Sequence, residues 1–296
     1  MPRILDAHVH AYPPELFTDA RGWANAHHEP WFADCVAPSD RPSIQGWSDV
    51  DQLLHDMDQA QVEQVVLLGW YWQNQSTCEW QNQLFAQWRA AHPDRIQAFA
   101  TTKPSSGSRG LDNVKRCLDS GFLGIGELLP QVQDFSLADE EFAALVELAT
   151  SAQVPINLHV TDPLLPPGPG SIATPLETYL QLAQKFPDTN FILAHWGGGL
   201  PFFELNPRVK RRLRNVYYDT AASPLIYNKS VFRHVVDLIG ADRILFGTDY
   251  PLRLYPRQSP APDFSRFIAD IDSAGLTAPE WDAIMGGNLR RLLKIP

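Results

Sequence analysis

Eight short apolar runs recur along the chain, and a longer segment with helical periodicity follows each of them. The runs occupy residues 3–9, 64–69, 96–101, 122–128, 155–160, 190–195, 216–220 and 243–247. Short apolar runs that alternate with helical segments are typical of βα units, whose strands lie parallel in one sheet. Eight such units favour closure into a (β/α)8 TIM barrel over an open doubly wound sheet.

The segments between the runs predict the helices of this barrel. They occupy residues 49–60, 77–91, 110–120, 139–152, 175–186, 202–214, 229–239 and 263–273, and a last helical segment at 279–293 is expected on the outside of the barrel. A chain of 296 residues is an ordinary length for one barrel, and it shows neither an internal repeat nor a domain boundary. We therefore expect residues 1–296 to form a single domain.

Two connections are too long to be simple turns. Residues 11–47 follow the first strand, and residues 161–174, which read TDPLLPPGPGSIAT, follow the fifth. Both begin at the carboxyl ends of strands, where barrels of this kind build their sites. We expect these long loops to be substrate lids.

Composition narrows the classes of partner. The 24 basic and 34 acidic side chains give a formal net charge of -10, which would repel a nucleic-acid backbone. No apolar run approaches the roughly 18 residues that a membrane helix needs. The N-terminus, MPRILDAHVH, carries no recognisable export signal, so we expect a cytoplasmic protein. A small-molecule substrate is the expected partner, and the sequence leaves open whether the chain forms a homo-oligomer.

The cysteines restrict the kind of metal site that the chain can build. Cys35, Cys78 and Cys117 are widely spaced and form no C-x-x-C pair. This pattern argues against a disulfide framework and against a thiolate zinc site. Any metal must therefore be held by histidine and carboxylate side chains.

The first strand carries the most specific chemical signal. In the segment DAHVH, His8 and His10 are two residues apart, so both imidazoles are expected on one face of the strand. Asp6 is expected on the same face, where it could orient an imidazole. This H-x-H spacing suits two ligands of one cation, although the pair alone occurs by chance in many proteins.

Further histidines and acids end later strands of the predicted barrel. They are Glu127 in FLGIGEL, His159 in PINLHV, His195 in FILAHW and Asp249 in ILFGTD. In a closed parallel barrel all strand ends point to one rim, so residues far apart in the sequence converge there. Neutral imidazoles and carboxylates suit Zn²⁺ first, with Mn²⁺ and Fe²⁺ as alternatives.

These motifs together resemble the amidohydrolase superfamily, specifically the amidohydrolase-related branch that includes aminocarboxymuconate-semialdehyde decarboxylase. The resemblance rests on the H-x-H pair, the later strand-end residues, and the segments LFGTDYP and IMGGNLRRLL. It implies that His8, His10, His159 and Asp249 bind a first metal. His195 would bind a second metal, act as acid or base, or contact the substrate.

The same resemblance leaves the number of metal ions at one or two. Binuclear relatives often bridge their ions with a carboxylated lysine on the fourth strand, where this sequence has Glu127. Glutamate can itself bind or bridge metals, and it can equally pair with a buried arginine.

Substrate contacts are predicted from residues that follow the strands. Trp70, Trp72 and Trp196 either wall an apolar pocket or pack beneath the lids. Arg253 either neutralises a substrate carboxylate or is a solvated charge at the rim.

Three functions compete at this point. The leading hypothesis is a metal-dependent hydrolase that activates water to cleave a C–N or C–O bond, with Asp249 accepting the proton of the water. The alternative is a non-oxidative decarboxylase of a small unsaturated or aromatic acid, in which Arg253 would grip the carboxylate. The third is a barrel without catalysis that serves as a binding scaffold.

Overall fold

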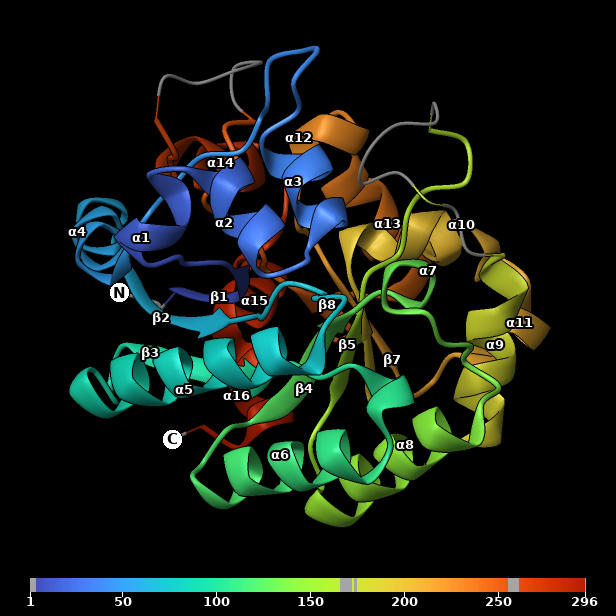
Figure 1. The fold of residues 1–296 in the computed structure, drawn as a ribbon. Coiled ribbons are helices and arrows are strands. Elements are labelled where there is room, and N and C mark those ends of the chain that lie inside the picture. The colour runs from blue at the N-terminus through green and yellow to red at the C-terminus, as the bar shows by residue number, and fades with distance from the viewer. Residues whose placement is uncertain (1–3, 166–171, 173–174, 255–260, 296) are drawn as a thin grey trace.

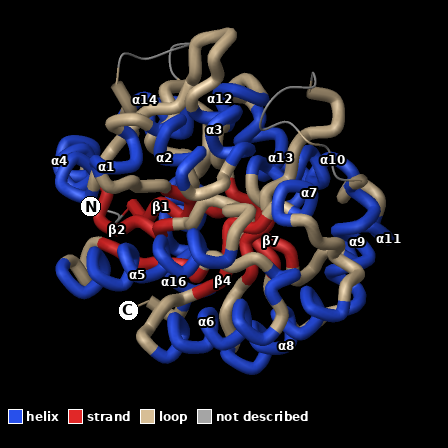
Figure 2. The backbone as a smooth tube through the Cα atoms, in the orientation of Figure 1, coloured by secondary structure: helices blue, strands red, loops and turns tan. Residues whose placement is uncertain are grey.

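Each predicted apolar run forms a strand in the computed structural model, which describes residues 4–165, 172, 175–254 and 261–295. The strands of this described part are β1 (Ile4–Val9), β2 (Val62–Leu67), β3 (Ile96–Ala100), β4 (Gly124–Leu128), β5 (Ile156–Leu158), β6 (Phe191–Leu193), β7 (Val216–Asp219) and β8 (Ile244–Leu245). They pair in chain order, and every ladder is parallel. The strands lie at the centre of the molecule with helices around them (Figure 2).

Backbone hydrogen bonds join the two ends of the sheet and close it. The Ala7 N–H donates to Phe246 O over 2.8 Å, and the Asp249 N–H donates to His8 O over 3.0 Å. A parallel bridge also connects Val9 with Tyr250. The predicted (β/α)8 barrel is therefore confirmed.

The helices that follow the strands agree with the predicted segments. They are α4 (Val50–Ala60), α5 (Gln75–Ala91), α6 (Ser108–Asp119), α8 (Glu140–Ala152), α9 (Leu176–Lys185), α13 (Val231–Ile239) and α14 (Ser265–Asp272). Their apolar faces pack on the outward side chains of the strands in one continuous core cluster. None of the described helices is both long and apolar enough to cross a bilayer.

Two predicted helices are interrupted. Residues 202–214 divide into α10 (Leu200–Phe203) and α11 (Pro207–Arg212), because Pro207 disfavours helical geometry at Asn206, which caps α11 instead. Residues 279–293 divide into α15 (Ala278–Asp282) and α16 (Asn288–Leu293), which flank a kink at Gly286.

The final helix takes a different place from the one predicted. Leu289, Leu292 and Leu293 of α16 join a cluster with Leu5 and with side chains of other strands that face the barrel interior. The end of the chain therefore contributes to the inner core, whereas the sequence predicted only an outer cover.

The long connection after β1 is also more ordered than its sequence suggests. It contains α1 (Pro14–Phe17), α2 (Ala20–Ala26) and α3 (Pro30–Val36), which gather on one side of the sheet, at the top of the view in Figure 1. We call residues 11–47 the cap. Its buried side chains, including Leu16 and Phe32, form a second apolar cluster with aromatic residues that follow β2.

Two further short helices lie at the strand ends, namely α7 (Pro130–Gln133) and α12 (Ser223–Ile226). The predicted second lid, residues 161–174, is described only in part. Residues 166–171 and 173–174 lie outside the described residues.

Packing inside the barrel predicts the effect of one substitution. Gly124 of β4 is paired with Phe99 of β3, and a Cβ at Gly124 would lie 2.5 Å from the Phe99 ring. Because Phe99 is fully buried and cannot move freely, Gly124→Ala should lower the free energy of unfolding by about 1–3 kcal/mol. Denaturant unfolding measures this loss.

The matched control is the same substitution in a Phe99→Leu background. There the smaller side chain leaves room for the new methyl group, so Gly124→Ala should cost less than in the wild-type chain. An equal loss of unfolding free energy in both backgrounds would refute the steric explanation.

Candidate metal centre

Six of the predicted site residues meet at the carboxyl ends of the strands. The structure brings together His8, His10, Glu127, His159, His195 and Asp249, which come from five different strand ends. They form three overlapping groups of three residues each. In every group the three potential ligand atoms, one from each residue, lie within 4.8 Å of one another. The convergence predicted for these side chains is therefore observed, and their assignment as metal ligands is a proposal developed below.

A bulge in β1 turns both histidines of the H-x-H pair toward this cluster. Asp6 pairs with Val65 and Val9 pairs with Leu67, so β1 uses one more residue than β2 between these points. Asp6 consequently bonds the Thr248 hydroxyl and the His8 backbone N–H, and no imidazole. The prediction that Asp6 orients an imidazole is wrong, because simple strand alternation does not continue through the bulge.

Asp219 takes the role that the sequence assigned to Asp6. This carboxylate at the end of β7 accepts a hydrogen bond from His8 Nδ1 over 3.0 Å. Since a carboxylate offers only lone pairs, Nδ1 must carry a proton, so in the neutral ring that a bound cation requires the lone pair lies on Nε2. Sequence reasoning missed Asp219, although its position at a strand end in VYYD is the same signal that identified the other residues.

The Nε2 atom of His8 is fully buried and has no hydrogen-bond partner in the described structure. It lies 3.5 Å from Glu127 Oε2 and 3.7 Å from Asp249 Oδ1. A buried polar atom without a partner is costly, and a cation beside this lone pair would satisfy it. The residues present therefore fit a bound metal ion.

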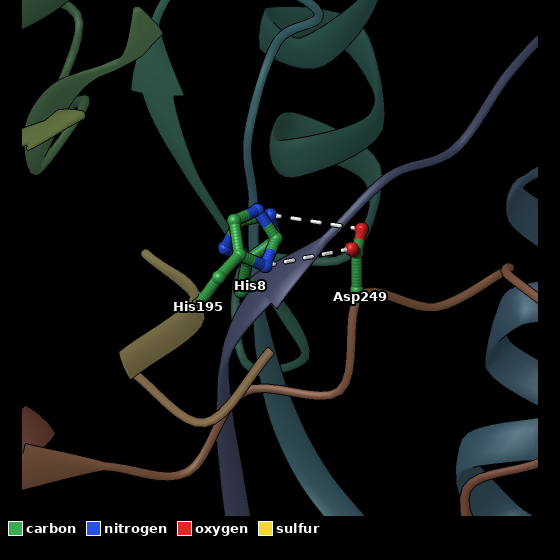
Figure 3. A group of neighbouring side chains, drawn as sticks. All are labelled: His8, His195 and Asp249. Atoms are coloured by element: carbon green, nitrogen blue, oxygen red, sulfur yellow. Dashed lines mark ion pairs between the residues drawn. The ribbon is translucent and has the colours of Figure 1, made fainter. Parts of the chain in front are cut away.

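Two further imidazoles are oriented in the same way. His10 Nδ1 donates to Leu68 O over 3.0 Å, and His195 Nδ1 donates to Ala221 O over 3.2 Å. Both therefore present Nε2 to the cluster. Figure 3 shows His8 and His195 beside Asp249, each with one ion pair to its carboxylate.

Glu127 occupies the middle of the cluster. Its oxygens lie 2.8 Å from His159 Nδ1, 3.5 Å from His195 Nε2 and 3.9 Å from His10 Nε2. The alternative that Glu127 pairs with a buried arginine is wrong, because its partners among the described residues are histidines.

The two carboxylates of the cluster hold negative charge deep in the protein. Burial raises the pKa of Glu127, but the charges of His8 and His159 outweigh burial and hold that pKa well below its usual range. Burial likewise raises the pKa of Asp249, while His10, His8 and His195 lower it overall. A divalent cation would compensate these buried anions.

His159 differs from the other histidines because both of its ring nitrogens are engaged. Nδ1 contacts Glu127, and Nε2 lies 3.2 Å from the Thr161 hydroxyl. To offer a lone pair to a cation, this side chain must release one of these two bonds.

A left-handed backbone turn carries His195 into the site. The φ angles of His195, Trp196 and Gly197 are 57°, 57° and 55°, and Gly198 continues the turn at 61°. Asp249 also has a positive φ of 65°. Non-glycine residues adopt this geometry at a cost of about 1–2 kcal/mol each, and such strain concentrates at functional sites.

A pocket of about 200 Å³ opens above the cluster. Its floor includes His10, Glu127, His159, His195 and Asp249, and residues 35–36 and 44–45 of the cap contribute to its walls. Trp70 and Tyr71 line it as aromatic residues, together with aliphatic side chains. No arginine or lysine of the described chain lines this pocket.

Three predicted substrate contacts lie elsewhere. Trp72 and Trp196 are fully buried, and their indole N–H groups donate to Gln81 and Ser223 respectively, so both belong to the core. Arg253 lines a neighbouring hollow, and its guanidinium donates to Ser43 O over 2.7 Å. Of the four predicted contacts, only Trp70 faces the pocket.

Comparison with known proteins identifies the family of this arrangement. The family model described as amidohydrolase matches residues 5–295. Among similar solved structures, 5-carboxyvanillate decarboxylase from Sphingomonas paucimobilis is 17% identical, with a TM-score of 0.78 and 100% of each chain covered.

Two other solved structures are similar over their whole length. The 2,6-dihydroxybenzoate decarboxylase from Rhizobium is 20% identical with a TM-score of 0.71, and the match covers 100% of this chain and 99% of that one. A dihydroxybenzoic acid decarboxylase from Polaromonas, with bound manganese and 2-nitroresorcinol, is 19% identical with a TM-score of 0.69, covering 100% and 98%. At these identities the likeness establishes a shared fold.

The contact between His8 and Asp219 predicts a measurable effect on cation binding. Asp219→Asn replaces one acceptor oxygen with a donor and removes the charge that orients the His8 ring, so the affinity for Mn²⁺ should fall about 10- to 100-fold. Titration calorimetry with Mn²⁺ measures this change. Asp112→Asn, on the exposed surface of α6, is the matched control and should bind like the wild type. An unchanged affinity in Asp219→Asn would contradict this role.

Proposed function

The chain belongs to the amidohydrolase family, and from this premise we propose that it is a divalent-metal-dependent decarboxylase of a small aromatic acid. One observation carries the proposal: oriented imidazoles and buried carboxylates converge beneath a small pocket with aromatic walls. The similar solved structures support the reaction, because their names describe decarboxylases of substituted benzoic acids.

We assign His8, His10, His159 and Asp249 as the ligands of one divalent ion. The unpartnered Nε2 of His8 supports this assignment, as do the hydrogen bonds that direct the Nε2 of His10 inward. Nitrogen and carboxylate ligands fit Zn²⁺, Mn²⁺ and Fe²⁺. The manganese in one similar decarboxylase makes Mn²⁺ our first choice here, whereas the sequence favoured Zn²⁺.

Glu127 is the proposed additional ligand. Its two oxygens face different histidines, with Oε2 toward His8 and Oε1 toward His195. This geometry suits either a fifth ligand of one ion or a bridge to a second ion that His195 would bind.

The dimensions of the pocket support a small substrate. About 200 Å³ lies below the range of roughly 300–1,000 Å³ that is common for drug-sized ligands, so a single substituted ring is the expected size. The faces of Trp70 and Tyr71 can pack against such a ring. Since the described lining contains no arginine or lysine, the metal centre is the expected partner of the substrate carboxylate.

Decarboxylation replaces a C–C bond with a C–H bond. The carboxylate leaves as CO2, its electron pair stays on the ring carbon, and that carbon takes up one proton. A bound divalent ion supplies charge that holds the carboxylate and stabilises negative charge on the substrate.

The protein must therefore hold a proton beside the ring. Asp249 and His195 both line the pocket, and their side chains approach within 3.9 Å. We assign these two residues to proton transfer. The buried site also limits the access of water to the ring carbon while the new C–H bond forms.

Hydrolysis, which the sequence favoured, is the second candidate. It rests on the description of the family as amidohydrolase and on the same Asp249 and His195, which could serve a water molecule equally well. The names of the similar structures favour decarboxylation over hydrolysis.

Product analysis separates these reactions. Mn²⁺-loaded protein incubated with 2,6-dihydroxybenzoate, 5-carboxyvanillate and related hydroxybenzoates should release CO2 from at least one of them. In D2O the product should carry one deuterium at the carbon that lost the carboxylate, because the proton comes from an exchangeable group. Headspace CO2 and mass spectrometry of the product measure both results.

Two variants test the assigned residues in the same assay. Asp249→Asn should lower kcat/KM about 10²- to 10⁴-fold, while Asp119→Asn, an exposed control at the end of α6, should not. Turnover of esters, lactones or amides without CO2 from any acid would favour hydrolysis instead. Failure of every substrate with every metal would favour the scaffold hypothesis.

A further inference from the structure

Four arginines gather around one hollow on the surface between α9 and α11. Arg208, Arg211 and Arg212 belong to α11 and Arg214 follows it, while Gln184 of α9 forms part of the opposite wall. The hollow has a volume of about 480 Å³. This size falls within the range of small-molecule sites.

The hollow and the candidate metal centre lie at opposite ends of the barrel. Asn215, at the edge of the hollow, directly precedes β7, and Pro187 belongs to the connection that leads into β6. The residues of the metal centre instead lie at the carboxyl ends of the strands. A ligand in this hollow therefore occupies a separate site.

The charge of the hollow is unusual for this chain. The formal net charge of the protein is -10, yet within the described residues none of these four guanidinium groups forms an ion pair. Seven other arginines are each paired with a carboxylate. Like charges placed together repel one another, so the cluster favours an anionic ligand.

Nearby carboxylates do not neutralise the cluster. Glu204 is already bound by Arg243 and by the Tyr218 hydroxyl. Asp188 is exposed beside Pro187 and adds a single negative charge. The net charge of the side chains around the hollow is therefore positive.

The Arg212 guanidinium is held in place by one hydrogen bond and keeps another N–H donor unpaired in the described structure. Arg212 Nη2 donates to Gln184 Oε1 over 2.6 Å, while its Nε is buried without a hydrogen-bond partner in the described structure. Asn215 Nδ2 donates to Phe186 O and Thr189 O, which ties the wall to the loop before β6. These contacts preform the hollow before any ligand arrives.

We propose that this hollow binds a small ligand that carries two or more phosphate groups. Arginine side chains match phosphate oxygens with paired hydrogen bonds, and several guanidinium groups around one hollow can engage successive phosphates. A long nucleic acid fits poorly, because the rest of this acidic protein would repel it.

Titration calorimetry with pyrophosphate tests the proposal on metal-loaded, full-length protein. Pyrophosphate should bind with one-to-one stoichiometry, more tightly than inorganic phosphate, and the affinity should fall as NaCl is raised. The double variant Arg208→Glu/Arg212→Glu should lose at least tenfold in affinity. Lys115→Glu/Arg116→Glu, which reverses two exposed charges on α6, should bind like the wild type.

A second variant separates lost binding from lost folding. Arg208→Gln/Arg212→Gln removes the charges without reversing them, and it should weaken pyrophosphate binding while the thermal midpoint and the activity of the metal centre stay unchanged. Binding of equal strength in wild type and both arginine variants would overturn the proposal, because the ligand would then occupy another site. Absence of pyrophosphate binding to the wild type, including the case in which only a long polyanion such as heparin binds, would overturn it as well.

Discussion

Closure of the sheet between β1 and β8 is the constraint on which the candidate site depends. The hydrogen bond from the Asp249 N–H to His8 O brings together two residues that lie 241 positions apart in the sequence. The bulge in β1 then turns His8 and His10 inward, and the end of β7 places Asp219 behind His8. Without closure, the Nε2 atom of His8 and the Asp249 carboxylate would not face the same position, and they could not bind one cation together.

The electrostatics of the cluster follow from this geometry. Two carboxylates with lowered pKa values are buried among imidazoles, three of which are fixed by a hydrogen bond at Nδ1. Buried charge of this kind is unfavourable unless it is compensated. Positive φ angles at His195 and Asp249 add local strain at the same place. The arrangement is thus explained by cation binding better than by folding stability alone.

Much of this organisation could be predicted from the sequence, because it follows from periodicity and from residue type at strand ends. The strands and the six converging residues were found in that way. The role of Asp219 was missed, because the role expected for Asp6 assumed regular alternation and the bulge in β1 breaks it. For Trp72 and Trp196 the sequence left pocket and core as open alternatives, because an indole after a strand can turn into either, and their hydrogen-bond partners in the structure place both in the core. The helices of the cap are short and depend on contacts with the aromatic residues that follow β2, which local sequence does not encode.

Anomalous scattering from crystals soaked in Mn²⁺ would test the central claim most directly. The account predicts a peak at about 2.0–2.3 Å from the Nε2 atoms of His8 and His10, with Asp249 and a ring nitrogen of His159 completing the ligands. A second peak between Glu127 and His195 would establish two ions. A map with no peak among these side chains, from crystals that bind Mn²⁺ elsewhere or not at all, would contradict the account.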